Sequence, residues 1–323
     1  MIRKNWRAFL AAALLCASAT VVAETWPSRM IRIVVPTAPG SSVDIVARLV
    51  GEKLGPMLGQ TVIVENKPGA NGTIGVDAVV NSRDGHTLLL GYNGPLTVSP
   101  SLTPKPPYNV QRDLAPIALV VTQPNVLAVR ADLKVNSLKE LIALAKSKPG
   151  TLDYASVGLG SLSNLSMELL KMQSGSYLVH IPFNGGPPAA LALSRGDVHV
   201  MFAALSNVQP LVKAGKVKLL AVSNAKRSAA VPDLPTVAES GFPGFDATTW
   251  NGFLAPASMP AETVARLNKL IVQIVQMPDV QQRLATAGAE VVHGGTPEQF
   301  GALLKHETAA WTKVIERSGI KLE

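Results

Sequence analysis

Two short glycine- and serine-rich segments of this chain have the composition of anion-binding loops. They are Gly40-Ser41-Ser42 and Gly158-Leu159-Gly160-Ser161, and each lies between a strand-like and a helix-like run. The first turn of a helix leaves backbone N–H groups unpaired and carries roughly half a positive charge, so it binds anions without a basic side chain. Glycine lets the backbone approach a ligand closely, and serine hydroxyls add donors. The two segments therefore predict carboxylate sites, although an ordinary strand-to-helix turn with a capping serine also explains each one alone.

Two further residues have an open role. Asp44 falls in the first helical turn after the serine pair, where a carboxylate is favourable to the helix dipole whether it caps the helix or contacts a ligand. Trp250, with Asn251 and Gly252, is either a pocket wall or a core residue.

The sequence lacks the motifs of common enzymes. The five histidines have no partner at metal-ligand spacing; they are His86, His180, His199, His293 and His306. There is no Gly-x-Ser-x-Gly elbow, Walker loop or full Gly-x-Gly-x-x-Gly fingerprint. No catalytic residue, metal or cofactor is therefore expected.

The formal charge of +8 is spread along the chain without a lysine or arginine block, and only 5% of residues are aromatic. This composition argues against a nucleic-acid partner. A mild positive field could attract anions, but a soluble surface with a slight excess of basic residues explains the charge equally well.

The amino terminus has the pattern of an export signal. Arg3, Lys4 and Arg7 precede an apolar run over residues 8–22, which is too short to span a membrane. We place cleavage before Glu24 rather than reading the run as a membrane anchor. The only cysteine, Cys16, lies inside this leader, so the mature chain has neither disulfides nor a cysteine nucleophile.

Strand-like and helix-like runs alternate, which predicts α/β units with a largely parallel sheet. Residues 31–35 read as a strand buried on both faces, followed by a helix from Val43 that Gly55-Pro56 should end. Residues 152–156 precede a helix over 162–170 that Ser161 or Ser163 could cap.

A third unit has a strand over 180–183, a short helix over 189–193 and a strand over 198–202. Further on, Pro260 opens one helix and the Thr-x-x-Gln capping box at Thr296 opens another. No segment has the composition of a flexible linker, so ordered strands should cross between the lobes.

Six stretches together resemble the Bug family of extracytoplasmic solute receptors, the substrate-binding components of tripartite tricarboxylate transporters. In order along the mature chain they are VVPTAPGSSVD (34–44), VENKPGANG (64–72), DGHTLL (84–89), YAS (154–156), PTVAESG (235–241) and WNG (250–252). The resemblance implies a type II periplasmic binding-protein fold, in which two α/β lobes joined by crossing hinge strands close on a ligand. Residues 1–23 would be the signal peptide, residues 24–123 and 232–323 lobe I, and residues 124–231 lobe II.

The resemblance also implies which residues bind the ligand. In this family the carboxylate is held by the loop before the first helix, partly through water, and by the equivalent loop of lobe II, while turns at Asn93 and Asn184 line the remaining walls. The ligand-binding residues expected on this basis are Ala38, Pro39, Gly40, Ser41, Ser42, Asp44, Asn93, Ser156, Gly158, Leu159, Gly160, Ser161, Asn184, Gly185 and Ala203.

This chain departs from the family pattern at a few positions. Ser41 stands where a second glycine is usual, Leu159 and Asn164 where a polar residue and a histidine are common, and Ala203 where an aspartate is usual. Without that aspartate a ligand amine has no carboxylate to pair with, so the sequence favours a dicarboxylate or an aromatic acid.

The function implied is that of a periplasmic receptor, not an enzyme, which captures a small organic carboxylate as a monomer and delivers it to membrane permease subunits. Two alternatives stay open: a ligand-sensing receptor that feeds a signalling partner, and a secreted hydrolase whose triad is assembled only in the fold.

Overall fold

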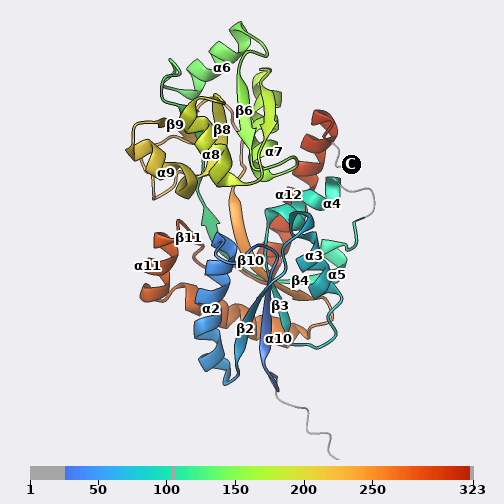
Figure 1. The fold of residues 1–323 in the computed structure, drawn as a ribbon. Coiled ribbons are helices and arrows are strands. Elements are labelled where there is room, and N and C mark those ends of the chain that lie inside the picture. Colours follow the sequence, from blue (N-terminus) through green and yellow to red (C-terminus); the bar gives the residue numbers. More distant parts are fainter. Residues whose placement is uncertain (1–25, 103–105, 321–323) are drawn as a thin grey trace, which may run out of the picture.

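The computed structural model describes residues 26–102 and 106–320, which form two α/β lobes, one above the other in Figure 1. Each lobe is built around its own sheet. The expected leader and the cleavage site before Glu24 lie outside the described residues. Within the described ranges no helix is both long and apolar enough to cross a membrane.

Lobe I contains a six-stranded sheet in the order β11–β4–β10–β3–β1–β2. Its strands are β1 (Ile31–Val35), β2 (Val62–Asn66), β3 (Thr87–Tyr92), β4 (Leu114–Gln123), β10 (Thr249–Pro256) and β11 (Glu290–Val291). Its helices are α2 (Ser42–Leu58), η1 (Ala70–Gly72), α3 (Thr73–Val80), η2 (Gly94–Val98), α4 (Ser99–Leu102), α5 (Val110–Asp113), α10 (Ala261–Val275), α11 (Pro278–Thr286) and α12 (Pro297–Ser318).

Lobe II contains a five-stranded sheet in the order β7–β6–β8–β5–β9. Its strands are β5 (Asn125–Arg130), β6 (Asp153–Ser156), β7 (Val179–Pro182), β8 (Val200–Ala204) and β9 (Val217–Val222). Its helices are α6 (Leu138–Ser147), α7 (Leu162–Ser174), α8 (Gly186–Arg195) and α9 (Leu205–Lys213).

Both sheets are mixed, so the prediction of a largely parallel sheet is wrong. β1 pairs in parallel with β2 and β3, and β6 pairs in parallel with β7 and β8. The strands near the lobe junction pair antiparallel, namely β10 with β3 and β4, and β5 with β8 and β9. The reason is that a strand which carries the chain from one lobe to the other runs against the β-α-β strands beside it.

The strand over 31–35 is confirmed as β1. Its apolar residues Ile31, Ile33 and Val35 pack in one core cluster and Val34 packs in another, so both faces of the strand are covered, although Arg32 interrupts the apolar run. The end predicted for the following helix is wrong, because α2 continues through Pro56 to Leu58. Pro56 lies in the last turn, where its missing N–H removes only one helical hydrogen bond. Gly59, at a φ of +68°, ends the helix instead.

Two short elements of the third unit also differ from prediction. The helix expected over 189–193 is α8 (Gly186–Arg195), because Gly186 and the two prolines after it already form its first turn. The strand expected over 198–202 begins and ends two residues later, as β8. The capping box at Thr296 is confirmed, with both reciprocal hydrogen bonds to Gln299 present.

Strand pairing shows which sheet edges face the opposite lobe. The chain passes from β4 to β5 through Pro124, and Asn125 pairs with Ala204, the last residue of β8. Because β6 and β7 run parallel to β8, the carboxyl ends of all three strands face lobe I. In lobe I, Gln123 pairs with Thr249 and Asn251 pairs with Tyr92, the last residue of β3. The carboxyl ends of β3 and its parallel neighbour β1 therefore face lobe II.

Helix α12 contacts the cores of both lobes. Phe300 and Leu304, near its amino end, pack in a cluster with strands of lobe I. Further along the helix, Trp311, Val314 and Ile315 pack in the cluster of lobe II. Figure 1 shows α12 running alongside the junction toward α7 of lobe II. The helix is thus a third connection between the lobes, in addition to the crossing strands.

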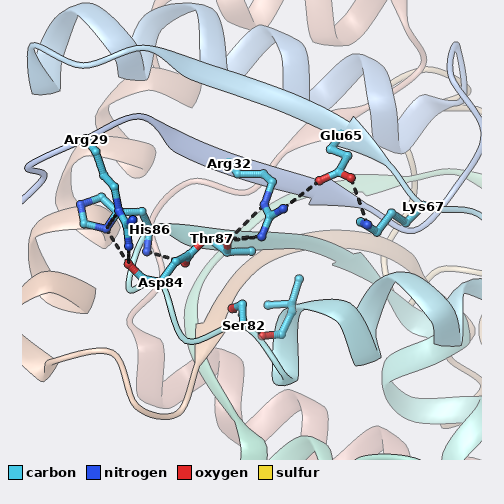
Figure 2. A network of polar contacts seen from close by, with 9 residues as sticks. Arg29, Arg32, Glu65, Lys67, Ser82, Asp84, His86 and Thr87 are labelled. Atoms are coloured by element: carbon cyan, nitrogen blue, oxygen red, sulfur yellow. Dashed lines mark hydrogen bonds and ion pairs between the residues drawn. The ribbon is translucent and has the colours of Figure 1, made fainter.

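A polar network, drawn in Figure 2, joins the first three strands of lobe I. Arg32 of β1 contacts Glu65 of β2 and donates to Thr87 of β3, and Thr87 in turn donates to Asp84. Burial alone would raise the pKa of Asp84, but hydrogen bonds from His86 and Thr87 and the charge of Arg32 hold it below its usual value. The DGHT stretch (84–87), one of those that resemble the family, therefore lies at the amino end of β3, away from the lobe junction, and stabilises the sheet.

Candidate functional site

The first loop connects β1 to α2 at the sheet edge that faces lobe II. Gly40 has a φ of +78°, which favours glycine, and the next residue, Ser41, is the N-cap of α2. The Ser41 Oγ accepts from the Asp44 N–H at 3.2 Å, and the Gly40 N–H donates to the Asp44 carboxylate at 2.9 Å. The serine and the aspartate thus fix this loop from two sides.

The second loop connects β6 to α7 at the facing edge of lobe II and has the same construction. Gly160 has a φ of +70°, and Ser161, rather than Ser163, is the N-cap. The Ser161 Oγ accepts from the Asn164 N–H at 3.3 Å, and the Gly160 N–H donates to Asn164 Oδ1 at 3.0 Å. The two N-cap serines also share their backbone conformation, with φ and ψ of −68° and 161° for Ser41 and −70° and 159° for Ser161.

The two loops therefore share a sequence pattern, Gly-Ser-x-x-Asp/Asn, that the composition alone did not reveal. Asn164 was noted only as a departure from the family pattern, yet it occupies the position that Asp44 occupies in lobe I. Comparing the two loops residue by residue from the N-cap serine would have found it.

Each loop leaves two backbone donors at the start of its helix. Considering only residues that the structure describes, the N–H groups of Ser42 and Val43 have no hydrogen-bond partner, and neither do those of Leu162 and Ser163. These are the first two positions of α2 and α7, where intrahelical partners do not exist. Because the two sheet edges face each other, two groups of anion donors lie at the lobe junction.

Asp44 is 2% exposed and lies beneath the first loop. Burial would raise its pKa, but hydrogen bonds from Arg48, the Gly40 N–H and Asn66, with the charge of Arg48, lower it below the usual value. The Asn66 amide also donates to the carbonyl of Thr37, so it links the end of β2 to the loop. Asp44 is therefore an ionised group that organises the loop, with both oxygens already in hydrogen bonds.

Replacing Asp44 by alanine is expected to lower the free energy of unfolding by roughly 1–2 kcal/mol, because the Gly40 N–H and Asn66 lose a buried acceptor. Asp44→Asn retains one acceptor and should lose less. Urea unfolding of the two variants checks this order. Equal losses would mean that the charge of Asp44, and not its hydrogen bonds, stabilises the loop.

In lobe II a second buried network supports the loop. The Asn164 amide donates to the hydroxyl of Tyr154, which donates to Glu168, and Glu168 accepts from Lys171 at 2.7 Å. Burial, followed by the hydrogen bond and charge of Glu168, raises the pKa of Tyr154 well above its usual range. The tyrosine therefore stays a neutral donor, and it holds Asn164 in position below Gly160.

A serine–histidine contact also occurs in lobe II. Ser156 Oγ lies 2.7 Å from His180 Nε2, and the histidine ring stacks on Tyr154. Burial is the main cause that lowers the pKa of His180, opposed by the charge of Glu168. Ser156 is 0% exposed, and its hydroxyl also contacts the Gly158 carbonyl. The pair therefore shapes the turn, and the serine is not presented to a substrate.

The remaining sequence-predicted residues do not all lie at the junction surface. Asn93 is 1% exposed, and its amide bonds to the carbonyl of Thr248, the N–H of Trp250 and the carboxylate of Glu307. Ala203 is buried in a second apolar cluster of lobe II, separate from the one that contains Trp311. By contrast, Ala38, Pro39 and Gly40 are exposed in the first loop, as are Leu159 in the second and Asn184 in the loop after β7.

Surface hollows lie elsewhere on the molecule. One of about 520 Å³ follows the carboxyl end of α2, and one of about 590 Å³ lies between residues 227–230 and the α11–β11 segment. Neither is lined by a residue of the two loops. In residues 26–102 and 106–320, no group of three or more His, Cys, Asp or Glu side chains is placed to hold a metal ion.

Comparison with known proteins gives the family. The model of the tripartite tricarboxylate transporter family receptor matches residues 46–320. The chain is 37% identical over 308 residues to protein BugT of Bordetella pertussis (strain Tohama I), covering 95% of this chain and 94% of BugT.

Solved structures agree with this match. The R. palustris protein Rpa4515 with adipate superposes with a TM-score of 0.79 at 33% identity, covering 92% of this chain and 99% of the other. MatC from Rhodopseudomonas palustris with bound malate gives 0.76 at 34% identity, covering 90% and 100%. The type II periplasmic binding-protein fold expected from the sequence is confirmed, and the chain belongs to the tripartite tricarboxylate transporter receptor family, the solute-binding proteins that include the Bug proteins.

Proposed function

We propose that this protein captures a small organic carboxylate between its two Gly-Ser loops, as the periplasmic receptor of a tripartite transporter. The observation that carries the proposal is the repeated loop geometry: two helices with free first-turn N–H groups begin at sheet edges that face each other. The structures of similar proteins with adipate and malate support the same ligand class.

Within this proposal the residues divide into two roles. The backbone of residues 38–42 and 158–162 contacts the ligand, with Asn184 and Gly185 beside the second loop. The capping and supporting side chains Ser41, Asp44, Ser161, Asn164 and Ser156 position that backbone, because each already makes hydrogen bonds within its loop. Asn93 and Ala203 are both buried: Asn93 acts through its hydrogen bonds to Thr248, Trp250 and Glu307, and Ala203 acts through packing.

The direct test is a thermal-shift screen of the mature protein against mono-, di- and tricarboxylates. A ligand that binds only the folded state at 100 times its Kd is expected to stabilise it by about 2.7 kcal/mol, which raises the Tm. The corresponding amides and alcohols are the control, since they lack the charge that helix N-termini favour. A broad carboxylate panel that leaves the Tm unchanged would refute the ligand class.

From the family match we also propose the cleavage site, the oligomeric state, the partners and the lobe bounds. The leader is removed before Glu24, the mature protein is a monomer, and permease subunits receive its ligand. Residues 24–123 and 232–323 constitute lobe I, and residues 124–231 constitute lobe II. Trp311 and Phe245 fall within the bounds of lobe I but pack in a core cluster with residues of lobe II, so we expect the segments around them to be an exception and to move with lobe II when the lobes close.

A further inference from the structure

The second loop exposes two apolar side chains at the lobe junction. Val157 is 37% exposed and Leu159 is 45% exposed. Both precede the N-cap Ser161, and the loop follows β6, whose carboxyl end faces lobe I. Single exposed apolar residues are ordinary on protein surfaces, but two in one loop beside free anion donors are a local feature that needs an explanation.

The polar side chains of the same loop are turned inward. Ser156 is fully buried, Ser161 Oγ donates to the Gly158 carbonyl at 2.6 Å, and Ser163 Oγ accepts from the Val157 N–H at 3.0 Å. The Asn164 amide is used by Gly160 and Tyr154. The loop therefore combines free backbone N–H groups with exposed aliphatic side chains.

The first loop has the same character. Ala38 and Pro39 are exposed at its tip, whereas the hydroxyls of Thr37 and Ser41 bond to each other and Ser42 donates to Gln123. Each loop thus combines donors for an anion with an apolar tip. A carboxylate group satisfies the donors, and only a hydrocarbon segment gains from contact with the tips.

We infer that the ligand is a carboxylate with an unsubstituted apolar body, a methylene chain or an aromatic ring, and that Leu159 and Val157 are specificity-determining residues that contact this body. The inference rests on the proposed function and narrows its ligand class. A hydroxylated dicarboxylate places a hydroxyl group against side chains that offer it no hydrogen bond, so burial of that group opposes binding.

Binding is tested by calorimetry with linear dicarboxylates from succinate to pimelate and with malate and tartrate. Affinity is expected to rise about fourfold for each added methylene until the ligand is longer than the distance between the two loops. Malate should bind more weakly than succinate. In Leu159→Asn the dependence on methylene number should flatten. Leu191→Asn, on α8 with the same 45% exposure, is the matched control and should keep it.

The outcomes separate this inference from the proposed function. If carboxylates bind but malate binds as tightly as succinate or more tightly, the inference of an apolar ligand body is overturned and the receptor function stands. The same holds if the affinity of Leu159→Asn still rises with each added methylene as it does for the wild type. If no carboxylate binds at all, the proposed function is wrong, and so is the inference that rests on it. Circular dichroism of Leu159→Asn shows that a flattened response comes from a folded protein.

Discussion

The free energy of unfolding is expected to fall as the pH rises from about 4.5 to about 7, because folding buries the carboxyl group of Glu307. Burial is the largest cause that raises its pKa, to about 7, and the charge of Asp246 adds to it, whereas donors from Trp250, Asn93 and Thr97 act in the opposite direction. A pKa that is higher in the folded state favours folding while the group is protonated. That contribution is complete below the ordinary value of 4.5 and is lost as the pH passes 7.

The geometry explains why the effect should be large. Glu307 Oε1 accepts from Trp250 Nε1 at 2.8 Å, and Oε2 accepts from Asn93 Nδ2 at 2.9 Å and Thr97 Oγ1 at 3.1 Å. These partners lie on β10, on η2 and just before it, so the carboxyl group joins α12 to the lobe junction. The difference between the folded and ordinary pKa corresponds to about 3 kcal/mol of stability between pH 4 and pH 8.

Urea unfolding at pH 5, 6, 7 and 8 measures this dependence. Glu307→Gln removes the titrating group, so its stability should change less over this range than that of the wild type. Glu316→Gln, an exposed position on the same helix, is the matched control and should follow the wild type. If the Glu307→Gln and wild-type profiles are parallel, another group causes the pH dependence.

Local patterns in the sequence were sufficient for the elements that carry the loops. The apolar run before Pro36 predicted β1, because strand burial depends on neighbouring residues. The serines before a helical repeat limited the N-cap of α7 to Ser161 or Ser163, and the structure selects Ser161. The end of α2 was missed because tertiary packing of Leu54 and Leu58 outweighs the local effect of Pro56. The mixed strand directions follow from how the chain crosses between lobes, which no local window contains.

The same distinction applies to the candidate site. Gly40 and Gly160 were identified by type and position, and the family resemblance correctly indicated the fold. The location of Asn93 was beyond sequence reasoning, because its partner Glu307 lies 214 positions away. The residues next to Asn93 in the sequence do not distinguish an amide that faces a ligand from one that hydrogen-bonds to a distant helix. The inward direction of Ser156 and Ser163 likewise depends on contacts with other parts of the loop and with His180.

Gly75→Ala is expected to weaken carboxylate binding by about tenfold or more, because it displaces the first loop without touching a ligand. A Cβ at Gly75 in α3 would lie 2.7 Å from the Cβ and 2.8 Å from the Cα of Pro36, and 2.9 Å from the Lys67 carbonyl oxygen. These are backbone and ring atoms that cannot rotate away. Pro36 is the residue that leads from β1 into the loop, so the overlap moves Ala38 to Ser42 relative to lobe II.

Gly301→Ala in α12 is the matched control, since its Cβ would meet only the Pro116 ring at an ordinary 3.5 Å. Calorimetry with the tightest dicarboxylate and urea unfolding should be measured on both variants. Overpacking at Gly75 is expected to cost roughly 1–3 kcal/mol of stability as well. The binding loss therefore has to be measured where both proteins are fully folded. A variant that loses stability but binds as the wild type would contradict this prediction, because the overlap would then be relieved by a shift of α3 and not of the first loop.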